Sequence, residues 1–216
     1  IGISSVLTLL FSVYAYYIAD QPIPDKENIV YLKTLLKNGD DYNETPYPLM
    51  ERVLSKSPDV KAATHLHGWG NIWIENEGRD FQNRTSYADP QFFEVFNLPL
   101  KYGNSKTAFK EKYSIVLTDK VSRQIFGNIN PVGKILIGAD TLNLRVTGVL
   151  KPISPYSALR LGVLLPNTLL KDNPIFKRQT NWANSFSPIY FKLRANSDTS
   201  KSVSYTHLTL PTICSV

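Results

Sequence analysis

Short runs of β-branched and aromatic residues, separated by Gly, Pro, Asn and Ser, recur along the middle of the chain. Such runs are typical of strands. We expect strands at residues 28–36, 60–66, 71–75, 81–87, 114–117, 134–137, 142–150, 162–165 and 189–194. No segment repeats at a period of about 20–50 residues, the sign of a repeat architecture. The pattern predicts a domain in which strands dominate.

Three short helices are predicted by apolar residues at helical spacing beside residues that start helices. Thr45 is the expected cap of the first helix, with Pro46 at its first position. The second begins at Asp89-Pro90, and the third is capped by Thr118 or Asp119. Together with the strands, these helices indicate an α+β fold. The core is expected to contain Phe92, Phe93, Phe96, Val116, Ile125, Phe126 and Val146.

The first eighteen residues, IGISSVLTLLFSVYAYYI, carry no charge, and the first charged side chain is Asp20. A helix of this length covers about 27 Å, close to the thickness of the hydrocarbon core of a bilayer. We interpret residues 1–18 as a transmembrane helix that lacks its beginning; a buried core helix is the alternative. The acidic segment that follows, DQPIPDKEN, is typical of a non-cytoplasmic flank. Residues 19–201 are therefore predicted to form a strand-rich extracytoplasmic domain.

Residues 202–216 contain no Asp, Glu, Lys or Arg. The segment VSYTHLTLPT, residues 203–212, resembles the translation of a transposase adapter used in sequencing libraries. We interpret residues 202–216 as a non-native tail and exclude them from functional reasoning. Cys214 and His207 are thereby removed from any site.

Composition describes an ordinary folded protein, with 43% hydrophobic and 19% charged residues. The chain has 24 basic and 18 acidic side chains and a net charge of +6. The basic residues are scattered, so no nucleic-acid partner is expected. The single cysteine, Cys214, excludes an intrachain disulfide, which fits either a reducing compartment or a bacterial envelope protein without disulfides.

His65-Leu66-His67 is the only metal-like pattern. Alternate strand positions place both imidazoles on one face, and Glu75, Glu77 and Asp80 follow nearby in sequence. The alternative is a solvent-facing strand edge without metal, in which replacement of His65 would leave stability unchanged.

Two tryptophans, Trp69 and Trp73, lie in the segment HGWGNIWIE. They either form a surface that binds a protein partner or cover a small core.

The sequence contains no pattern that supports catalysis or cofactor binding. The Gly133-Lys134 pair invites comparison with a phosphate loop, but that loop requires a Gly at position 128 and a hydroxyl at 135, where this chain has Asn128 and Ile135. No ordered set of nucleophile, His and Asp is present either. We therefore expect a noncatalytic protein without cofactors.

The order of four segments resembles the MacB-like periplasmic core domain of FtsX-type ABC-transporter permeases, over about residues 1–195. The segments are TSYADPQFFEVFNLPLKYGN (85–104), SIVLTDKVSRQIFGNINPVGKIL (114–136), LRVTGVLKPI (144–153) and GVLLPN (162–167). The resemblance implies a domain that lies outside the bacterial inner membrane, between a first transmembrane helix and three later ones. Because those later helices are absent here, the chain is expected to be a fragment.

The resemblance also implies partners. A separate cytoplasmic subunit would hydrolyse ATP, a second permease subunit would complete a dimer, and membrane lipid would surround the span. The domain would then pass rigid-body movement to a substrate or an envelope partner, for export or envelope remodelling. A membrane-anchored extracytoplasmic sensor or binding module is the alternative, which would use the same anchor and an apolar ligand cleft.

Overall fold

The computed structural model describes residues 23–35, 41–139, 141–154, 157, 159–195 and 197. Within these residues, no helix is both long enough and apolar enough to cross a membrane. The transmembrane helix predicted at residues 1–18 and the tail predicted at 202–216 both lie outside the described residues.

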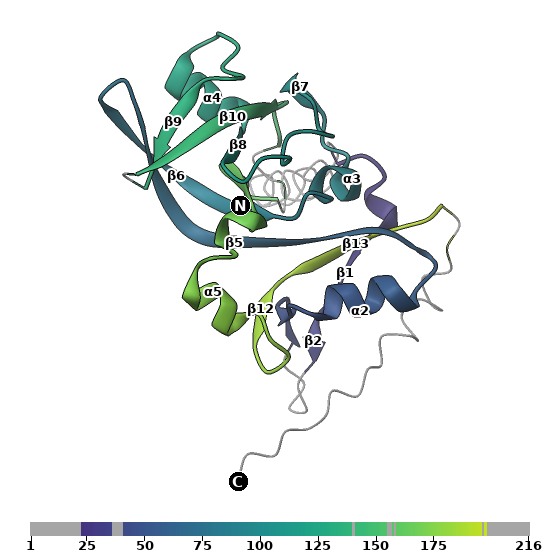
Figure 1. Cartoon of the computed structure of the whole chain (residues 1–216). Coiled ribbons are helices and arrows are strands. Elements are labelled where there is room, and N and C mark those ends of the chain that lie inside the picture. Colours follow the sequence, from purple (N-terminus) through teal and green to yellow (C-terminus); the bar gives the residue numbers. More distant parts are fainter. Residues whose placement is uncertain are drawn as a thin grey trace, which may run out of the picture.

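The described chain is rich in strands, as predicted, with short helices between them (Figure 1). In chain order the elements are η1 (Lys26–Asn28), β1 (Ile29–Tyr31), β2 (Thr34–Leu35), β3 (Asp41–Tyr42), β4 (Thr45–Pro46), α2 (Leu49–Lys56), β5 (Val60–Asn76), β6 (Arg79–Ala88), α3 (Phe92–Phe96), β7 (Leu100–Gly103), β8 (Ser114–Leu117), α4 (Asp119–Phe126), β9 (Ile135–Gly138), β10 (Leu142–Leu150), β11 (Val163–Pro166), η2 (Asn167–Leu170), α5 (Pro174–Gln179), β12 (Ser185–Ser187) and β13 (Ile189–Leu193).

Six strands pair in a closed circuit, which we call the strand ring. The order is β5, β6, β11, β8, β10 and β9, and β9 returns to β5 through the pairs Ile74–Gly138 and Glu75–Ile137. The β6–β11 and β8–β10 pairings are parallel and the others are antiparallel. Aliphatic side chains from these strands and from α4 pack together: Ile72, Ile74, Ile115, Leu117, Val121, Ile125, Leu136, Leu144, Val146, Val163 and Leu165.

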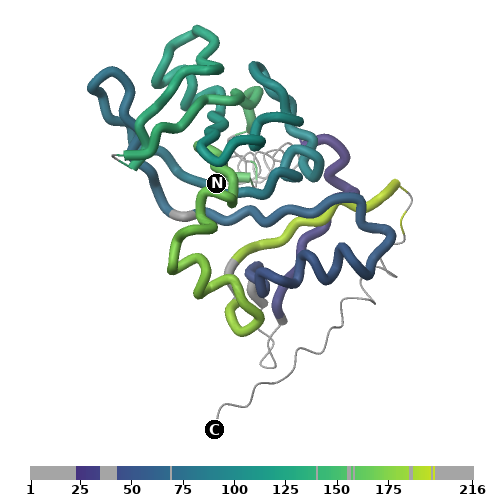
Figure 2. Tube along the Cα trace, in the orientation of Figure 1, coloured from purple at the N-terminus to yellow at the C-terminus, as the bar shows by residue number. Residues whose placement is uncertain are grey.

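A second layer, the side sheet, consists of β1, β13 and the first part of β5. Antiparallel pairing places Phe191 between Val30 and Ala63, so the first and last described strands lie side by side (Figure 2). Alternate residues point to opposite faces. One face, with Ala63 and Phe191, packs against α2, and the other, with Ala62 and Tyr190, packs against α3. Figure 1 shows these two helices on opposite sides of β5.

The long strand β5 belongs to both the strand ring and the side sheet. It runs for 17 residues, pairs with β13 at its start and with β6 and β9 further on. The sequence predicted two separate strands, 60–66 and 71–75, because Gly68 and Gly70 intervene. The structure joins them through a register shift between Gly68 and Asn71, where Gly70 adopts φ 72°. Such a bulge bends a strand without ending it.

The first helix begins later than predicted. Thr45 and Pro46 form β4, which pairs with β12, and the Thr45 hydroxyl donates to the carbonyl of Ser187 at 3.3 Å. The helix α2 starts at Leu49, after Pro48 at the cap position. Pairing with a segment distant in sequence therefore overrides the local capping signal.

The third helix, α4, follows the prediction. Thr118 caps it, because its hydroxyl accepts the backbone N–H of Val121 at 3.4 Å, and the helix ends at Phe126. The core prediction is confirmed at Phe92, Phe93, Phe96, Val116, Ile125 and Val146. It is wrong at Phe126, which is half-buried because its ring lies at the helix end, under the Lys134 ammonium at 5.3 Å.

Candidate functional site: a buried polar junction

Four buried polar residues meet where the strand ring joins the side sheet, and we call them the polar junction. Thr64 and His65 come from β5, Asp89 follows β6, and Asn167 begins η2 directly after β11. Since β6 and β11 run parallel, with Ala88 beside Pro166, their carboxyl ends bring Asp89 and Asn167 to the same place.

Asp89 is the centre of this network. Its Oδ2 accepts the backbone N–H of His65 at 2.7 Å and lies 2.8 Å from the ring Nδ1 of the same residue. Its Oδ1 accepts the Asn167 amide at 2.9 Å, and its own N–H donates to the Thr64 hydroxyl at 3.2 Å. Both carboxylate oxygens therefore have donors, which buried charge requires.

His65 is 1% exposed and is held from both sides of its ring. Beyond the contact with Asp89, its Nε2 lies 3.0 Å from the backbone oxygen of Tyr47, and the Tyr47 ring stacks on the imidazole at 3.8 Å. A carboxylate and a carbonyl only accept hydrogen bonds. The protonated imidazolium is thus the form of His65 that satisfies both contacts, and it pairs with the Asp89 carboxylate.

The electrostatics agree with this pairing. Burial alone raises the pKa of the Asp89 carboxyl, but the hydrogen bonds and charge of His65, with the Asn167 amide, outweigh it and hold that pKa below its usual value. Burial, together with the nearby Asp89 charge, raises the pKa of the Tyr47 phenol. The junction therefore holds one compensated ion pair, and the neighbouring Tyr47 phenol stays neutral.

His67, two residues along β5, lies in an aromatic pocket. Its ring stacks with Tyr87 at 5.8 Å and with Phe176 of α5 at 6.0 Å, and its Nδ1 lies 3.4 Å from the Ser187 hydroxyl. Burial, and next the charge of His65, lowers the pKa of His67 to about 4. His67 is therefore neutral at physiological pH.

The arrangement joins chain segments and is largely buried: the His65 side chain is 1% exposed and the Asp89 side chain 13% exposed. It ties β5, the end of β6 and the start of η2 to the loop before α2. Removal of one partner of a buried ion pair leaves a buried charge without compensation, which costs about 3–5 kcal/mol. For a His65 that is buried and paired, we therefore predict a loss of stability on replacement, in place of the unchanged stability expected for a solvent-facing residue.

The structure also corrects both interpretations of the histidine pair. With exposures of 1% and 5%, neither His65 nor His67 faces solvent, because helices and loops cover β5 there on both faces. Glu75 accepts the N–H of Gly78 at the hairpin tip, away from the junction. Across the described ranges, no three His, Cys, Asp or Glu residues are placed to hold a metal ion.

Of the two tryptophans, Trp73 is 53% exposed on β5, in the part of the strand ring next to β9. The side chain of Trp69 lies outside the described part of the structure. Asp89 and Asn167 were not recognised as site residues from the sequence. Their only signal is a polar residue directly after each of two apolar strands, and that signal depends on knowing that these strands pair in parallel.

The family model of the MacB-like periplasmic core domain matches residues 1–204. No curated protein sequence matches this chain.

Solved structures share the fold. A domain assigned to a permease protein from Porphyromonas gingivalis superposes with a TM-score of 0.70 at 21% identity, covering 83% of this chain and 81% of that one. The periplasmic region of MacB from Actinobacillus actinomycetemcomitans gives 0.57 at 18% identity, with 75% and 71% covered. The extracellular domain of the noncanonic ABC-type transporter YknZ from Gram-positive bacteria gives 0.55 at 14% identity, with 81% and 86% covered.

Proposed function

Since the chain belongs to the family of MacB-like periplasmic core domains, we propose that it transmits movement within an ABC-transporter permease. Membership of this family supports a position on the periplasmic side of a permease, a class of membrane protein that works with cytoplasmic ATPase subunits. In this proposal, a separate subunit hydrolyses ATP and the permease subunit itself is noncatalytic. Its domain carries the resulting displacement to cargo or to an envelope partner.

The observation that carries this proposal is that one strand, β5, belongs to both parts of the domain. A displacement applied to the side sheet pulls directly on the strand ring, because the same hydrogen-bonded backbone continues through both. Two further contacts resist separation of the parts. The first is a hydrophobic cluster with residues from both parts, such as Ala62 of the side sheet and Leu164 of the strand ring. The second is the polar junction, whose hydrogen bonds join the same two parts.

The proposal includes a partner surface at Trp69 and Trp73. Exposed Trp73 is the described member of this pair, and large exposed aromatic side chains are common anchors of protein interfaces. We assign this surface to an envelope partner. The other proposed partners are a second permease subunit, which forms a dimer, and the lipid of the bacterial inner membrane around residues 1–18.

The experiment uses the complete permease with its ATPase subunit in nanodiscs. Residues 1–201 contain no cysteine, so spin labels attach within this domain only at Leu54→Cys on α2 and Ile129→Cys after α4, both exposed positions. Rigid transmission predicts the same distance between the two labels with ATP and with ADP. A label pair between this domain and the ATPase subunit should change its distance with the nucleotide.

A matched pair of variants tests the role of the junction. Asn167→Ala removes the amide that donates to Asp89, and it should broaden the distance distribution between the labels while ATP hydrolysis continues. Asn83→Ala removes another buried amide, which donates to the nearby carbonyl of Phe81 and lies outside the junction, and it should leave the distribution narrow. A label distance that changes with nucleotide in the unmodified domain would contradict rigid transmission.

The intact gene separates this proposal from the alternative of a membrane-anchored sensor. A gene that continues into a cytoplasmic signalling domain, and not into three further spans, would favour the sensor.

A further inference from the structure

A cleft of about 680 Å³ opens on the strand ring at the start of α4. Its wall includes Arg84 of β6, the first residues of α4, and residues that lead from β10 towards β11. The volume lies within the range of about 300–1,000 Å³ that is typical of small-molecule sites.

The floor of the cleft depends on a glycine. Gly162, directly before β11, accepts the N–H of Thr118 at 3.1 Å and lies against the backbone of Arg84. A Cβ at position 162 would stand 2.4 Å from the Arg84 carbonyl oxygen, so only glycine allows β6, β8 and β11 to meet this closely. The cleft is therefore built on a tightly packed part of the ring.

Positive charge dominates the wall, which carries the basic side chains of Arg84, Lys120, Arg123 and Arg160. Its one carboxylate, Asp119, is already paired: Lys101 donates to it at 2.8 Å and Arg123 lies 2.7 Å away. The hydrogen bond from Lys101, followed by the charge of Arg123, holds the pKa of Asp119 below its usual value. Within the described chain, the other three basic side chains have no acidic partner.

The wall also carries apolar side chains, beside the polar residues Thr118, Ser154 and Ser157. Leu159 is buried, and Ile153 and Leu161 pack against the same hydrophobic cluster. A fully hydrated ion gains nothing from these apolar side chains, whereas an uncharged apolar molecule leaves three cations without an anion. From this combination we infer that the cleft binds a small anionic amphiphile, with a phosphate or carboxylate head at Arg84, Lys120 and Arg160 and an apolar body against Ile153 and Leu161, which are only partly buried.

This inference goes beyond the transmission of movement, and it is tested without ATP or an ATPase. Calorimetric titration of the 216-residue chain with hexyl phosphate, which does not form micelles at the concentrations used, measures the binding. Hexyl phosphate should bind saturably, at least tenfold more tightly than inorganic phosphate or hexanol. Because the head contacts are charged, raising the salt concentration should weaken the binding.

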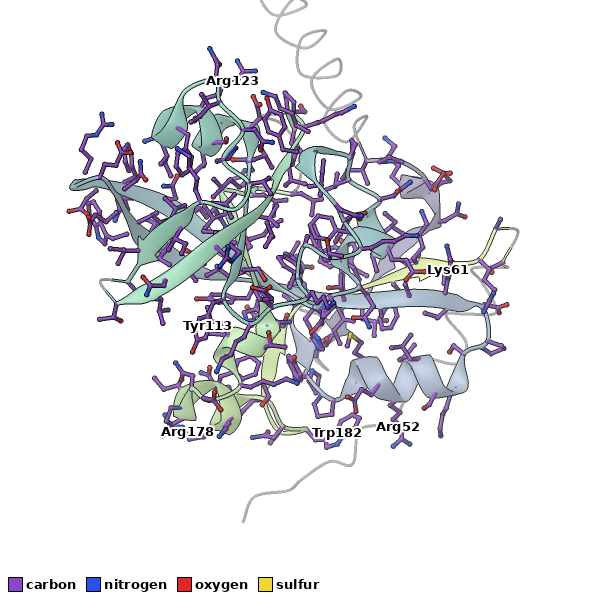
Figure 3. The ribbon with its side chains drawn as sticks, turned by 45° about the horizontal axis from the view of Figure 1, so that its top comes forward. Arg52, Lys61, Tyr113, Arg123, Arg178 and Trp182 are labelled. Atoms are coloured by element: carbon purple, nitrogen blue, oxygen red, sulfur yellow. The ribbon has the colours of Figure 1, made fainter. Side chains whose placement is uncertain are left out.

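Variants assign the binding to the cleft. Arg84→Gln and Arg160→Gln should each weaken hexyl phosphate binding about tenfold, which is the loss of one charged hydrogen bond. Both side chains are exposed and have no acidic partner among the described residues, so the fold should persist. The matched control is Arg178→Gln, an exposed arginine on α5, which Figure 3 places at the opposite end of the molecule from Arg123. Binding to the control should equal binding to the unmodified chain.

A competitor identifies the source of the ligand. If dihexanoyl phosphatidylglycerol displaces hexyl phosphate, the cleft accepts a lipid headgroup; if it does not, the ligand is a soluble single-chain anion. Either result keeps the inference. It is overturned if hexyl phosphate does not bind saturably, if inorganic phosphate binds equally well, or if Arg84→Gln and Arg160→Gln bind like Arg178→Gln.

Discussion

Mild acid should destabilise the fold through one buried imidazole, that of His67. Its pKa is about 4 in the folded protein, against an ordinary value of 6.5. At pH values between 4 and 6.5, the imidazole of His67 is largely protonated in the unfolded chain and largely neutral in the folded chain. The contribution of neutral His67 to the free energy of unfolding is therefore complete above pH 6.5 and is lost as the pH falls towards 4. The linkage between protonation and folding gives a fall in the free energy of unfolding of about 2–3 kcal/mol between pH 7.5 and pH 4.5.

Urea unfolding, followed by circular dichroism at constant ionic strength, measures this loss in the unmodified chain and in His67→Phe. The variant keeps an aromatic ring beside Tyr87 and Phe176, and Ser187 still donates to the Pro188 carbonyl. His65 and Asp89 are present in both proteins, so the two proteins differ only at position 67. The carboxyls with lowered pKa values, among them Asp89, start from 3.8 and titrate below this interval.

The unmodified chain should lose about 2–3 kcal/mol more than His67→Phe between pH 7.5 and pH 4.5. Equal losses in the two proteins would refute the reasoning, since they would mean that His67 does not change its protonation on unfolding. A difference that appears only below pH 4 would place the cause at the carboxylates instead.

Three substitutions test the packing. Phe93→Ala should lower the free energy of unfolding in urea by about 3–5 kcal/mol, because the ring is buried in the aromatic cluster; a loss below 1 kcal/mol would contradict this placement. His65→Ala should cost about 3–5 kcal/mol near neutral pH by leaving Asp89 buried without its cation, and the double variant with Asp89→Asn should recover part of that loss. Gly162→Ala should lower the thermal midpoint, because the new methyl group would overlap the backbone of β6; an unchanged midpoint would show that the strands separate freely there.

Elements whose signals lie within a few residues were predictable from the sequence. The helix α4 has its capping threonine, Thr118, and its apolar face within one short segment, and the predicted start matches. The strands β8 and β10 are also local patterns and have the predicted bounds, and β9 lies one residue later than predicted. Thr45 has an equally good capping signal, yet it pairs with β12, a segment more than a hundred residues later.

The polar junction could not be predicted because its partners are distant in the chain. His65 and Asp89 are separated by 24 residues, and Asn167 lies 78 residues after Asp89. The alternation in His65-Leu66-His67 correctly indicates a strand. It does not tell which face is covered, since the rings that cover the two imidazoles belong to Tyr47 and Phe176, which are distant in sequence.

The pairing of β5 with β13 also sets the order in which a newly made chain can finish folding. His65 pairs with Ile189, and every strand that completes the ring is synthesised between these two residues. At a synthesis rate of about 5–20 residues per second, the edge of β5 remains unpaired for on the order of ten seconds before β13 is made. During this interval the edge is open to pairing with other chains, a known aggregation hazard. A chain that stops before Ile189 can close the ring but leaves this edge of β5 permanently unpaired.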